Sequence, residues 1–551
     1  MKQVIVGAFI ATAIFNLLFF KVFVGIGVGF IFLLFNFYFF FIRNKENSYT
    51  QLGIQSSCIA VFFGFLLAFR ANEIVSFINY ICAGFFSLIS LYLYKQPKVI
   101  TYKILDFLTA PFILLRDTIA GIFGEANYKK DFSSLKKPHS KSLLRGVVIA
   151  LPLLFVLFVI LSHADPIFNK LVNQGLSSIG ERFIFSAFVL FSLVALGLAE
   201  LKKSPEVKKI IEHASGKPYE AVVIVGSIVL LFAAFIMVQF RYLFSKVSIQ
   251  DLHQLGINSL TYSEYVRKGF FELLIAAVIT IGVAIYVLHF LHLANGKIKR
   301  VLQVSTGVLL IEVGLLLASA AQRVMLYEAA NGMTRARMFG LVFLVWLSIM
   351  LLIFLVKVFR DIKQKWFFSA VISTTLIVVL GMNVINIDGL IATKYKPTVN
   401  KEIDYYYLAY LSYDGYESWK PALIYIDKEF SRLEKLQTLT VEDNRRFTWA
   451  HFTLRQLYNN REFLRAKYGS YDEFVEMYKQ AKQPITAELR QMREWQSFNL
   501  AEYIAYLNIK NDPQVKQIPM LLYRTIDIDK KVSEPIRYNT PLDRSRMAPF
   551  M

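Results

Sequence analysis

Long apolar segments separated by short polar connections fill the first 385 residues of the chain. A helix needs about 20 apolar residues to cross roughly 30 Å of hydrocarbon, and about eleven segments reach or approach that length. The pattern therefore predicts an all-α fold, a polytopic helical membrane bundle. The predicted spans are 4–20, 22–42, 52–69, 74–94, 146–162, 183–199, 221–240, 269–291, 301–321, 339–356 and 366–385.

Two parts of this pattern leave alternatives open. The first two spans are separated only by Lys21 and nearby glycines, so a single long tilted helix is the alternative there. Residues 104–123 are mostly apolar but carry Asp106, Arg116 and Asp117. Burying those charges in hydrocarbon is expensive, which favours an interfacial amphipathic helix over a twelfth span. A basic cytoplasmic loop over 126–145 is expected to follow it.

Residues 386–551 change character, because long apolar runs give way to charged residues with helical spacing of the hydrophobic positions. Three helices are predicted around Trp419–Phe430, 447–457 and 495–507. The pattern predicts a soluble all-helical domain that ends in an irregular tail from Ile526 onward. The expected domains are thus 1–385 in the membrane and 386–551 in water.

Composition agrees with the bilayer as the main solvent. The chain is 56% hydrophobic with 50 Phe in 551 residues, and its mean hydropathy is +0.47. A soluble fold has too little interior to bury so much apolar surface. The net charge of +21 would suggest nucleic acid as a partner, but residues 1–385 carry +18 of it, mainly in short loops. Such loops are typical of a membrane protein beside anionic lipid, so we expect no nucleic acid.

The distribution of these basic residues predicts the topology. Loops after the even-numbered spans, together with Lys2, hold about 25 Lys and Arg, against about 11 on the other side. Since basic loops stay in the cytoplasm, we expect a bacterial inner-membrane protein with a cytoplasmic N-terminus and an extracytoplasmic C-terminal domain. The initial Met1–Lys2 and apolar run has no cleavage signature and is expected to stay as the first span.

Polar residues gather at the span ends that this topology places on the outer face. The group, called the outer polar cluster below, comprises His163, Asp165, Gln239, Arg241, Tyr242, Tyr262, Glu264, Tyr265, Arg267, Glu272, Gln322, Arg323, Tyr327, Glu328, Thr334 and Arg337, with Arg335 beside them. These side chains are expected to pair into a network closing the bundle or to line a ligand pocket. Interfacial Arg and Tyr are also ordinary membrane anchors, so the structural interpretation is favoured.

Glu312 is the clearest charged position inside a predicted span, near the middle of 301–321. A carboxyl at that depth needs a partner, a water-filled cavity or a function. It is interpreted either as a proton or cation site or as a carboxyl hydrogen-bonded to a neighbouring helix for packing.

Soluble-enzyme signatures are absent from the sequence. His289 and His292 share a helix face but lack the further ligands a metal needs, and no phosphate loop, nucleophile elbow or zinc-protease motif occurs. Cys58 and Cys82 fall inside predicted spans, so no disulfide is expected. We expect no catalytic residues, no metal and no cofactor.

Several motifs resemble one known family. They are Ser162–Phe168, Gln239–Phe244, Thr261–Leu273, Arg323–Arg337, Asn386–Gly389 and Trp495–Leu500. Together they resemble an uncharacterised bacterial polytopic membrane family, domain of unknown function 4173, which is related to domain 4153. Ile387 stands where that family tends to have Pro, and Tyr413–Tyr416 departs from its Asp-hydrophobic-Pro turn. The resemblance implies a bacterial membrane protein and no activity.

The expected role is a non-enzymatic envelope sensor, scaffold or assembly component. Its partners are expected to be the lipid bilayer and an envelope protein that meets 386–551, and the sequence leaves the oligomeric state open. A proton- or cation-coupled secondary transporter that uses Glu312 is the first alternative. A membrane-embedded transferase acting on a lipid-linked substrate is the second.

Overall fold

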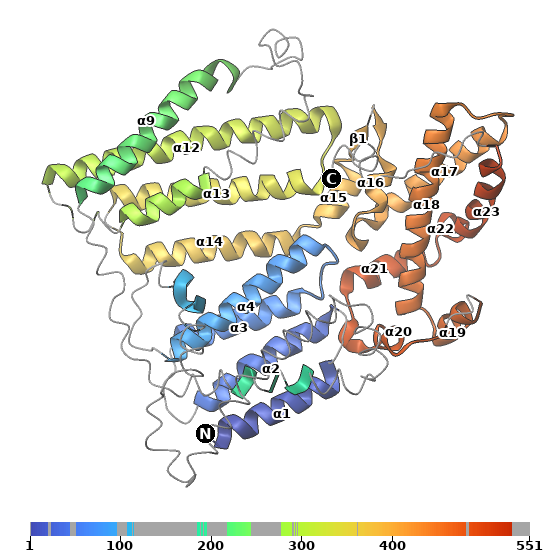
Figure 1. The fold of residues 1–551 in the computed structure, drawn as a ribbon, viewed down its shortest axis with the longest axis horizontal. Helices are drawn as coiled ribbons and strands as arrows, with labels where there is room; N and C mark the ends of the chain where they lie inside the picture. Colours follow the sequence, from blue (N-terminus) through green and yellow to red (C-terminus); the bar gives the residue numbers. More distant parts are fainter. Residues whose placement is uncertain are drawn as a thin grey trace, which may run out of the picture. The chain divides into compact units, whose positions relative to one another are not determined.

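A computed structural model of the chain is shown in Figure 1. It describes residues 2–19, 24–43, 51–95, 107–112, 114, 185–187, 189–190, 192–194, 218–243, 277–288, 291, 294, 296–360, 362–399, 401–480 and 484–531. These residues form helices, with one two-stranded hairpin among them, so the all-α prediction is confirmed for the described part. The chain divides into two compact units, described separately below.

Unit 1 contains 1–330, 336–385 and 487–499. Its helices are α1 (Lys2–Phe19), α2 (Ile26–Arg43), α3 (Gln51–Leu66), α4 (Glu73–Lys95), α9 (Pro218–Leu243), α12 (Gly296–Asn331), α13 (Arg335–Phe359), α14 (Gln364–Val384), α20 (Ala487–Gln491) and the 3-10 helix η4 (Trp495–Ser497). The last residue of α12 and the first of α13 belong to unit 2.

Four of the described helices are long and apolar enough to cross a membrane: Glu73–Tyr94, Gly296–Gln322, Arg335–Phe359 and Gln364–Val384. Only 28 to 50% of the residues in their apolar windows are buried inside the protein. Side chains such as Leu352 and Ile377, at 61% and 67% exposed, face outward. A helix that is apolar on its outer face needs an apolar solvent there, so these helices indicate a membrane protein.

The predicted count of eleven spans stays a prediction. Shorter apolar helices, which overlap other predicted spans, lie at Val4–Leu18, Ile26–Ile42, Gln51–Leu66, Ala221–Leu230 and Ala277–Leu288. The predicted span 146–162 and the basic loop 126–145 lie outside the described residues. Of the predicted interfacial helix 104–123, the structure describes 107–112 and 114, where Phe107 contacts Phe368 of α14.

Helices of unit 1 pack closely where small residues face aromatic ones. A Cβ added to Gly29 of α2 would lie 2.4 Å from Phe65 of α3, so the glycine admits that ring. Helices α12, α13 and α14 lie side by side (Figure 1). Gln303 of α12 donates to the carbonyl of Val358, and Trp346 of α13 donates to the Thr375 hydroxyl. Direct packing of this kind is what holds helices together in lipid, where apolar surface is already solvated.

Unit 2 contains 331–335, 386–486 and 500–551. Its elements are α15 (Ile387–Thr393), β1 (Thr398–Val399), β2 (Glu402–Ile403), α16 (Tyr405–Ala409), η3 (Tyr413–Ser418), α17 (Trp419–Glu434), α18 (Val441–Tyr468), α19 (Tyr471–Gln480), α21 (Leu500–Ile509), α22 (Pro513–Lys516) and α23 (Ile518–Asp529). The strands pair antiparallel, with Thr398 opposite Ile403 and Val399 opposite Glu402.

The core of unit 2 lies between α17, α18, α21 and α23. Trp419, Ile426, Phe430, Leu457 and Ile518 are among its fully buried members. Helix α18 begins with a capping box, in which the Thr440 side chain and Asp443 bond each other's backbone N–H groups. The first two helices predicted from hydrophobic spacing in this region are therefore confirmed.

The third helix predicted in this region is wrong as a single element. Residues Trp495–Ser497 form η4, Phe498 is extended with φ −62° and ψ 129°, and α21 starts only at Leu500. The break arises because the Phe498 carbonyl accepts from the N–H of Ile26, at 3.0 Å, at the start of α2. The irregular tail predicted from Ile526 is wrong for its first residues, since α23 continues to Asp529, and residues 532–551 lie outside the described residues.

Gly25 generates a prediction about this contact. A Cβ added to Gly25 would lie 2.6 Å from the Ser497 carbonyl carbon, and backbone cannot move aside as a side chain can. We expect Gly25→Ala to lower the free energy of unfolding by about 1–3 kcal/mol, measured as a lower Tm of the purified protein in detergent. Gly84→Ala is the control, because no described residue of another segment lies within 4 Å of its added Cβ. Equal Tm values for both variants would contradict the close approach.

Candidate functional site

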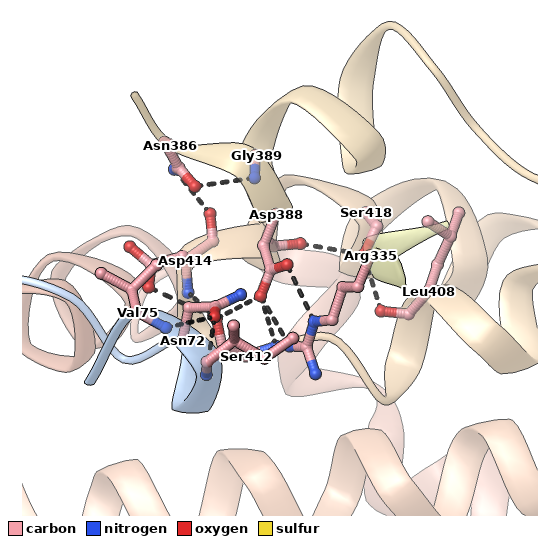
Figure 2. A network of polar contacts seen from close by, with 12 residues as sticks. Asn72, Val75, Arg335, Asn386, Asp388, Gly389, Leu408, Ser412, Asp414 and Ser418 are labelled. Carbon is pink, nitrogen blue, oxygen red and sulfur yellow. Dashed lines mark hydrogen bonds and ion pairs between the residues drawn. The ribbon is translucent and has the colours of Figure 1, made fainter. Parts of the chain in front are cut away.

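A buried ion pair lies at the centre of a polar network in unit 2 (Figure 2). Arg335 donates through Nε to Asp388 Oδ1 at 2.9 Å and through Nη2 to Oδ2 at 2.6 Å. The Asp388 side chain is 0% exposed and that of Arg335 is 19% exposed. This two-bond arrangement is the strong form of an Arg–carboxylate pair, and it joins residues 53 positions apart.

Ser412 supplies the remaining donors to this carboxylate. Its backbone N–H donates to Asp388 Oδ2 at 3.1 Å, and its hydroxyl donates to the same oxygen at 2.5 Å. Ser412 is also the N-cap of η3, where its Oγ accepts from the N–H of Asp414. The carboxylate therefore connects the first residue of α13, the helix α15 and the start of η3.

Neighbouring caps keep these segments in register. Asn386 is the N-cap of α15, and its Oδ1 accepts from the N–H of Gly389 at 2.8 Å. Its Nδ2 donates to the carbonyl of Asp414 at 2.8 Å. Ser418, the last residue of η3, donates to the carbonyl of Gly415 at 2.9 Å and to that of Leu408 at 3.4 Å, the second of which is seen in Figure 2. One amide side chain thus starts α15 and holds η3 beside it.

The connection between α12 and α13 is shaped for the same network. Gly332 has φ +69°, and a Cβ there would lie 2.0 Å from the Lys396 carbonyl oxygen, so only glycine fits. Met333 N–H donates to the Tyr395 carbonyl at 2.9 Å. Arg335 N–H donates to the Tyr407 hydroxyl at 2.7 Å. These bonds hold the backbone of the α12–α13 connection in place, so that Arg335 lies beside Asp388.

Asp388 is held in its ionised form. Burial alone raises the pKa of its carboxyl, but the hydrogen bonds and charge of Arg335, with the bonds from Ser412, lower that pKa below its ordinary value. A carboxylate with donors on both oxygens and no exposed surface is enclosed. The arrangement is suited to joining segments rather than to proton transfer or ligand binding.

The structure describes only part of the outer polar cluster. Thr334 is buried beside Arg335, and Gln322, Glu328 and Arg337 are half-buried. Arg323 and Tyr327 lie on α12, and Gln239, Arg241 and Tyr242 lie on α9, but their side chains are outside the described set. The residues His163, Asp165, Tyr262, Glu264, Tyr265, Arg267 and Glu272 lie outside the described residues altogether. The convergence predicted for the cluster stays a prediction.

A second polar group, in unit 1, escaped the sequence analysis. Asn79 of α4 and Asn383 of α14 exchange side-chain hydrogen bonds of 2.7 and 2.9 Å. Arg70, between α3 and α4, donates to the carbonyls of Asn383 and Val384 at the end of α14. Asn499 donates to the Arg70 carbonyl at 3.0 Å. Amides inside apolar runs were the available signal, since a buried amide in lipid needs a partner.

Glu312 lies on α12 with the residue 8% exposed. Its Oε2 is buried and has no hydrogen-bond partner among the described residues. Among all the residues that the structure describes, no group of three or more His, Cys, Asp or Glu side chains is arranged to hold a metal ion.

Helices of spanning length, together with an enclosed network at the start of α13, define an all-α membrane protein. A family model described as "Domain of unknown function (DUF4153)" matches residues 57–420. The match covers more than half of the chain and includes the whole Arg335–Asp388 network, so the chain belongs to this family. The Trp495–Leu500 motif lies outside the matched residues. Searches of the curated proteins and of the solved structures found no match.

Removing the buried charge gives a direct test of the network. We expect Asp388→Asn to lower the free energy of unfolding of unit 2 by about 3–5 kcal/mol, because Arg335 keeps its charge and loses the carboxylate that balances it. Hydrogen exchange of α15 and η3 in the purified protein measures this loss. The control is Asp527→Asn, whose pair with Lys530 is 76% and 70% exposed and contributes little. Unchanged exchange in both variants would mean that the ion pair does not stabilise the unit.

Acid should weaken the Arg335–Asp388 ion pair. The pKa of Asp388 is lower in the folded protein than in the unfolded chain, so its contribution is complete above the unfolded value of about 4. The contribution is lost as pH falls through the folded pKa. We expect the stability difference between wild type and Asp388→Asn to shrink below about pH 4. A difference that stays constant down to pH 2 would contradict the assignment.

Proposed function

We propose that the protein is a non-enzymatic component of the bacterial envelope that senses or scaffolds at the cytoplasmic membrane. In this proposal about eleven spans anchor it, the N-terminus is cytoplasmic, and 386–551 form an extracytoplasmic helical domain that meets an envelope protein. The charge bias of the loops supports the orientation. We also propose that the chain is related to the family of domain of unknown function 4173, which its motifs resemble.

The Arg335–Asp388 ion pair is the observation that carries the proposal. Arg335 is the first residue of α13, and Asp388 follows α14 by four positions. Both residues belong to the unit that contains α17 and α18. The chain continues from Arg335 into α13, and three residues separate Asp388 from the end of α14. In this proposal a change in the unit is passed to the two helices along these short covalent connections. Such a connection supports a sensing role, in which a signal received by one part of the chain has to reach another.

The topology and the coupling are tested together. A phosphatase that is active only outside the cytoplasm, fused after Met551, should be active, and green fluorescent protein fused there should stay dark. In a deletion strain of the source bacterium under envelope stress, wild type should restore growth, and Arg335→Gln should fail although the protein accumulates in the membrane. Lys530→Gln is the control, because its pair is exposed. A fluorescent C-terminus, or full rescue by Arg335→Gln, would overturn the proposal.

A proton- or cation-coupled transporter is the second candidate, and the buried Oε2 of Glu312 favours it. Proton flux in vesicles distinguishes the two. A scaffold gives the same background flux for wild type and Glu312→Gln, whereas a transporter gives flux that is lost in Glu312→Gln.

A further inference from the structure

Unit 2 contains a second site, which is open to solvent, whereas the Arg335–Asp388 network is enclosed. A cavity of about 230 Å³ lies between the β1–β2 hairpin, α16, α17 and α18, elements that Figure 1 labels near one another. Its floor includes Ile426, Ala450 and Thr453, which are buried. Concave sites with an apolar floor and a few polar groups are the usual form of small-molecule sites.

Aromatic rings form the walls of this cavity. Tyr405 and Tyr425 stack with their centroids 5.0 Å apart and their planes at 30°. Tyr406 and Trp449 meet edge to face, also at 5.0 Å. All four residues are half-buried, so they combine fixed positions with accessible surface. Rings held by one another offer rigid apolar contact area at a low entropic cost.

Charged side chains form the rim. Arg446 donates through Nη2 to Glu402 at 3.0 Å and through Nε to Glu442 at 3.5 Å. Arg445 donates to Glu442 at 2.7 Å. A guanidinium has five N–H donors, so these pairs orient Arg446 and leave donors directed elsewhere. The carboxylates supply acceptors at the same edge.

The balance of charge restricts the ligand. Two guanidinium groups, of Arg445 and Arg446, pair with the carboxylates of Glu442 and Glu402. The third carboxylate of the lining, Asp404, is the N-cap of α16 and accepts from the N–H of Tyr407. The carboxylates disfavour an anion, and the guanidinium groups disfavour a cation. A neutral ligand that both accepts and donates hydrogen bonds is the best match, provided that it also presents C–H groups to aromatic faces. A sugar ring has both properties, and the cavity is smaller than the roughly 300–1,000 Å³ of drug-sized sites.

We propose that this cavity binds one neutral sugar ring, with Trp449 and the tyrosines against its C–H faces and Arg446 and Glu402 at its hydroxyls. The assignment of that sugar to an envelope glycan, as the input of a sensor, rests on the proposed function. Sugar binding itself does not depend on the side of the membrane.

The test uses the full-length protein in amphipol, because maltoside and glucoside detergents carry the competing group. N-acetylglucosamine, its disaccharide and glucose are titrated separately by calorimetry and by tryptophan fluorescence. We expect at least one of them to bind in the millimolar range and to change the fluorescence. The change should disappear in Trp449→Phe and persist in Trp495→Phe, since Trp449 lines the cavity and Trp495 is not among its lining residues.

A matched pair of arginine variants tests the rim. Arg446→Gln should weaken binding about tenfold, because it removes charged hydrogen bonds. Arg465→Gln should leave binding unchanged, since Arg465 lies on the same α18 with similar exposure, 34% against 35%, and pairs with Glu462 away from the cavity. Both variants are required to keep the wild-type Tm.

Three results would overturn the proposal: no sugar binds, choline or glutamate binds in preference to the sugars, or binding is equal in Arg446→Gln and Arg465→Gln. Sugar binding together with a fluorescent cytosolic C-terminus would keep this site and overturn the envelope role. If no sugar binds and the C-terminus is extracytoplasmic, the sugar site is overturned and the envelope role is kept.

Discussion

The enclosed carboxylate of Asp388 is the constraint on which the arrangement of unit 2 depends. An ionised group without contact to water loses several kcal/mol of solvation, and only well-placed partners offset that loss. Here the partners come from separate segments: the guanidinium of Arg335 at the start of α13, and the N–H and hydroxyl of Ser412 at the start of η3. Displacing either segment would leave a buried charge unsatisfied, so α15, η3 and the start of α13 keep one arrangement.

The same requirement operates in unit 1 through neutral groups. Asn79 and Asn383 lie within apolar helices, where an unpaired amide is costly, and they bond each other. Arg70 supplies donors to the last carbonyls of α14, and Asn499 holds the Arg70 carbonyl. Polar groups rather than apolar contacts thus select which helices meet, because apolar surface gains little from leaving lipid for protein.

The cavity between the β1–β2 hairpin and α16, α17 and α18 contrasts with both networks. Its aromatic walls and paired charges remain accessible, whereas Asp388 is closed to solvent. The two regions of unit 2 thus differ in role. The Asp388 network holds segments in place, and the cavity offers aromatic and charged groups to the proposed small ligand. The family match ends at residue 420, so most of α17 and all of α18 lie beyond it, and much of this surface belongs to the part of the chain outside the match.

Local pattern determined much of this protein from sequence alone. The length of apolar runs predicted the helices α4, α12, α13 and α14, and hydrophobic spacing predicted α17 and α18, because both signals depend on neighbouring residues. Arg335 was expected in a polar network, but its partner 53 positions away was decided only by the tertiary structure. The tertiary structure also decided the Asn79–Asn383 pair and the break at Phe498, where the backbone bonds Ile26 instead of continuing a helix. A charge or amide requires some partner, and only the packing of distant segments decides which one it finds.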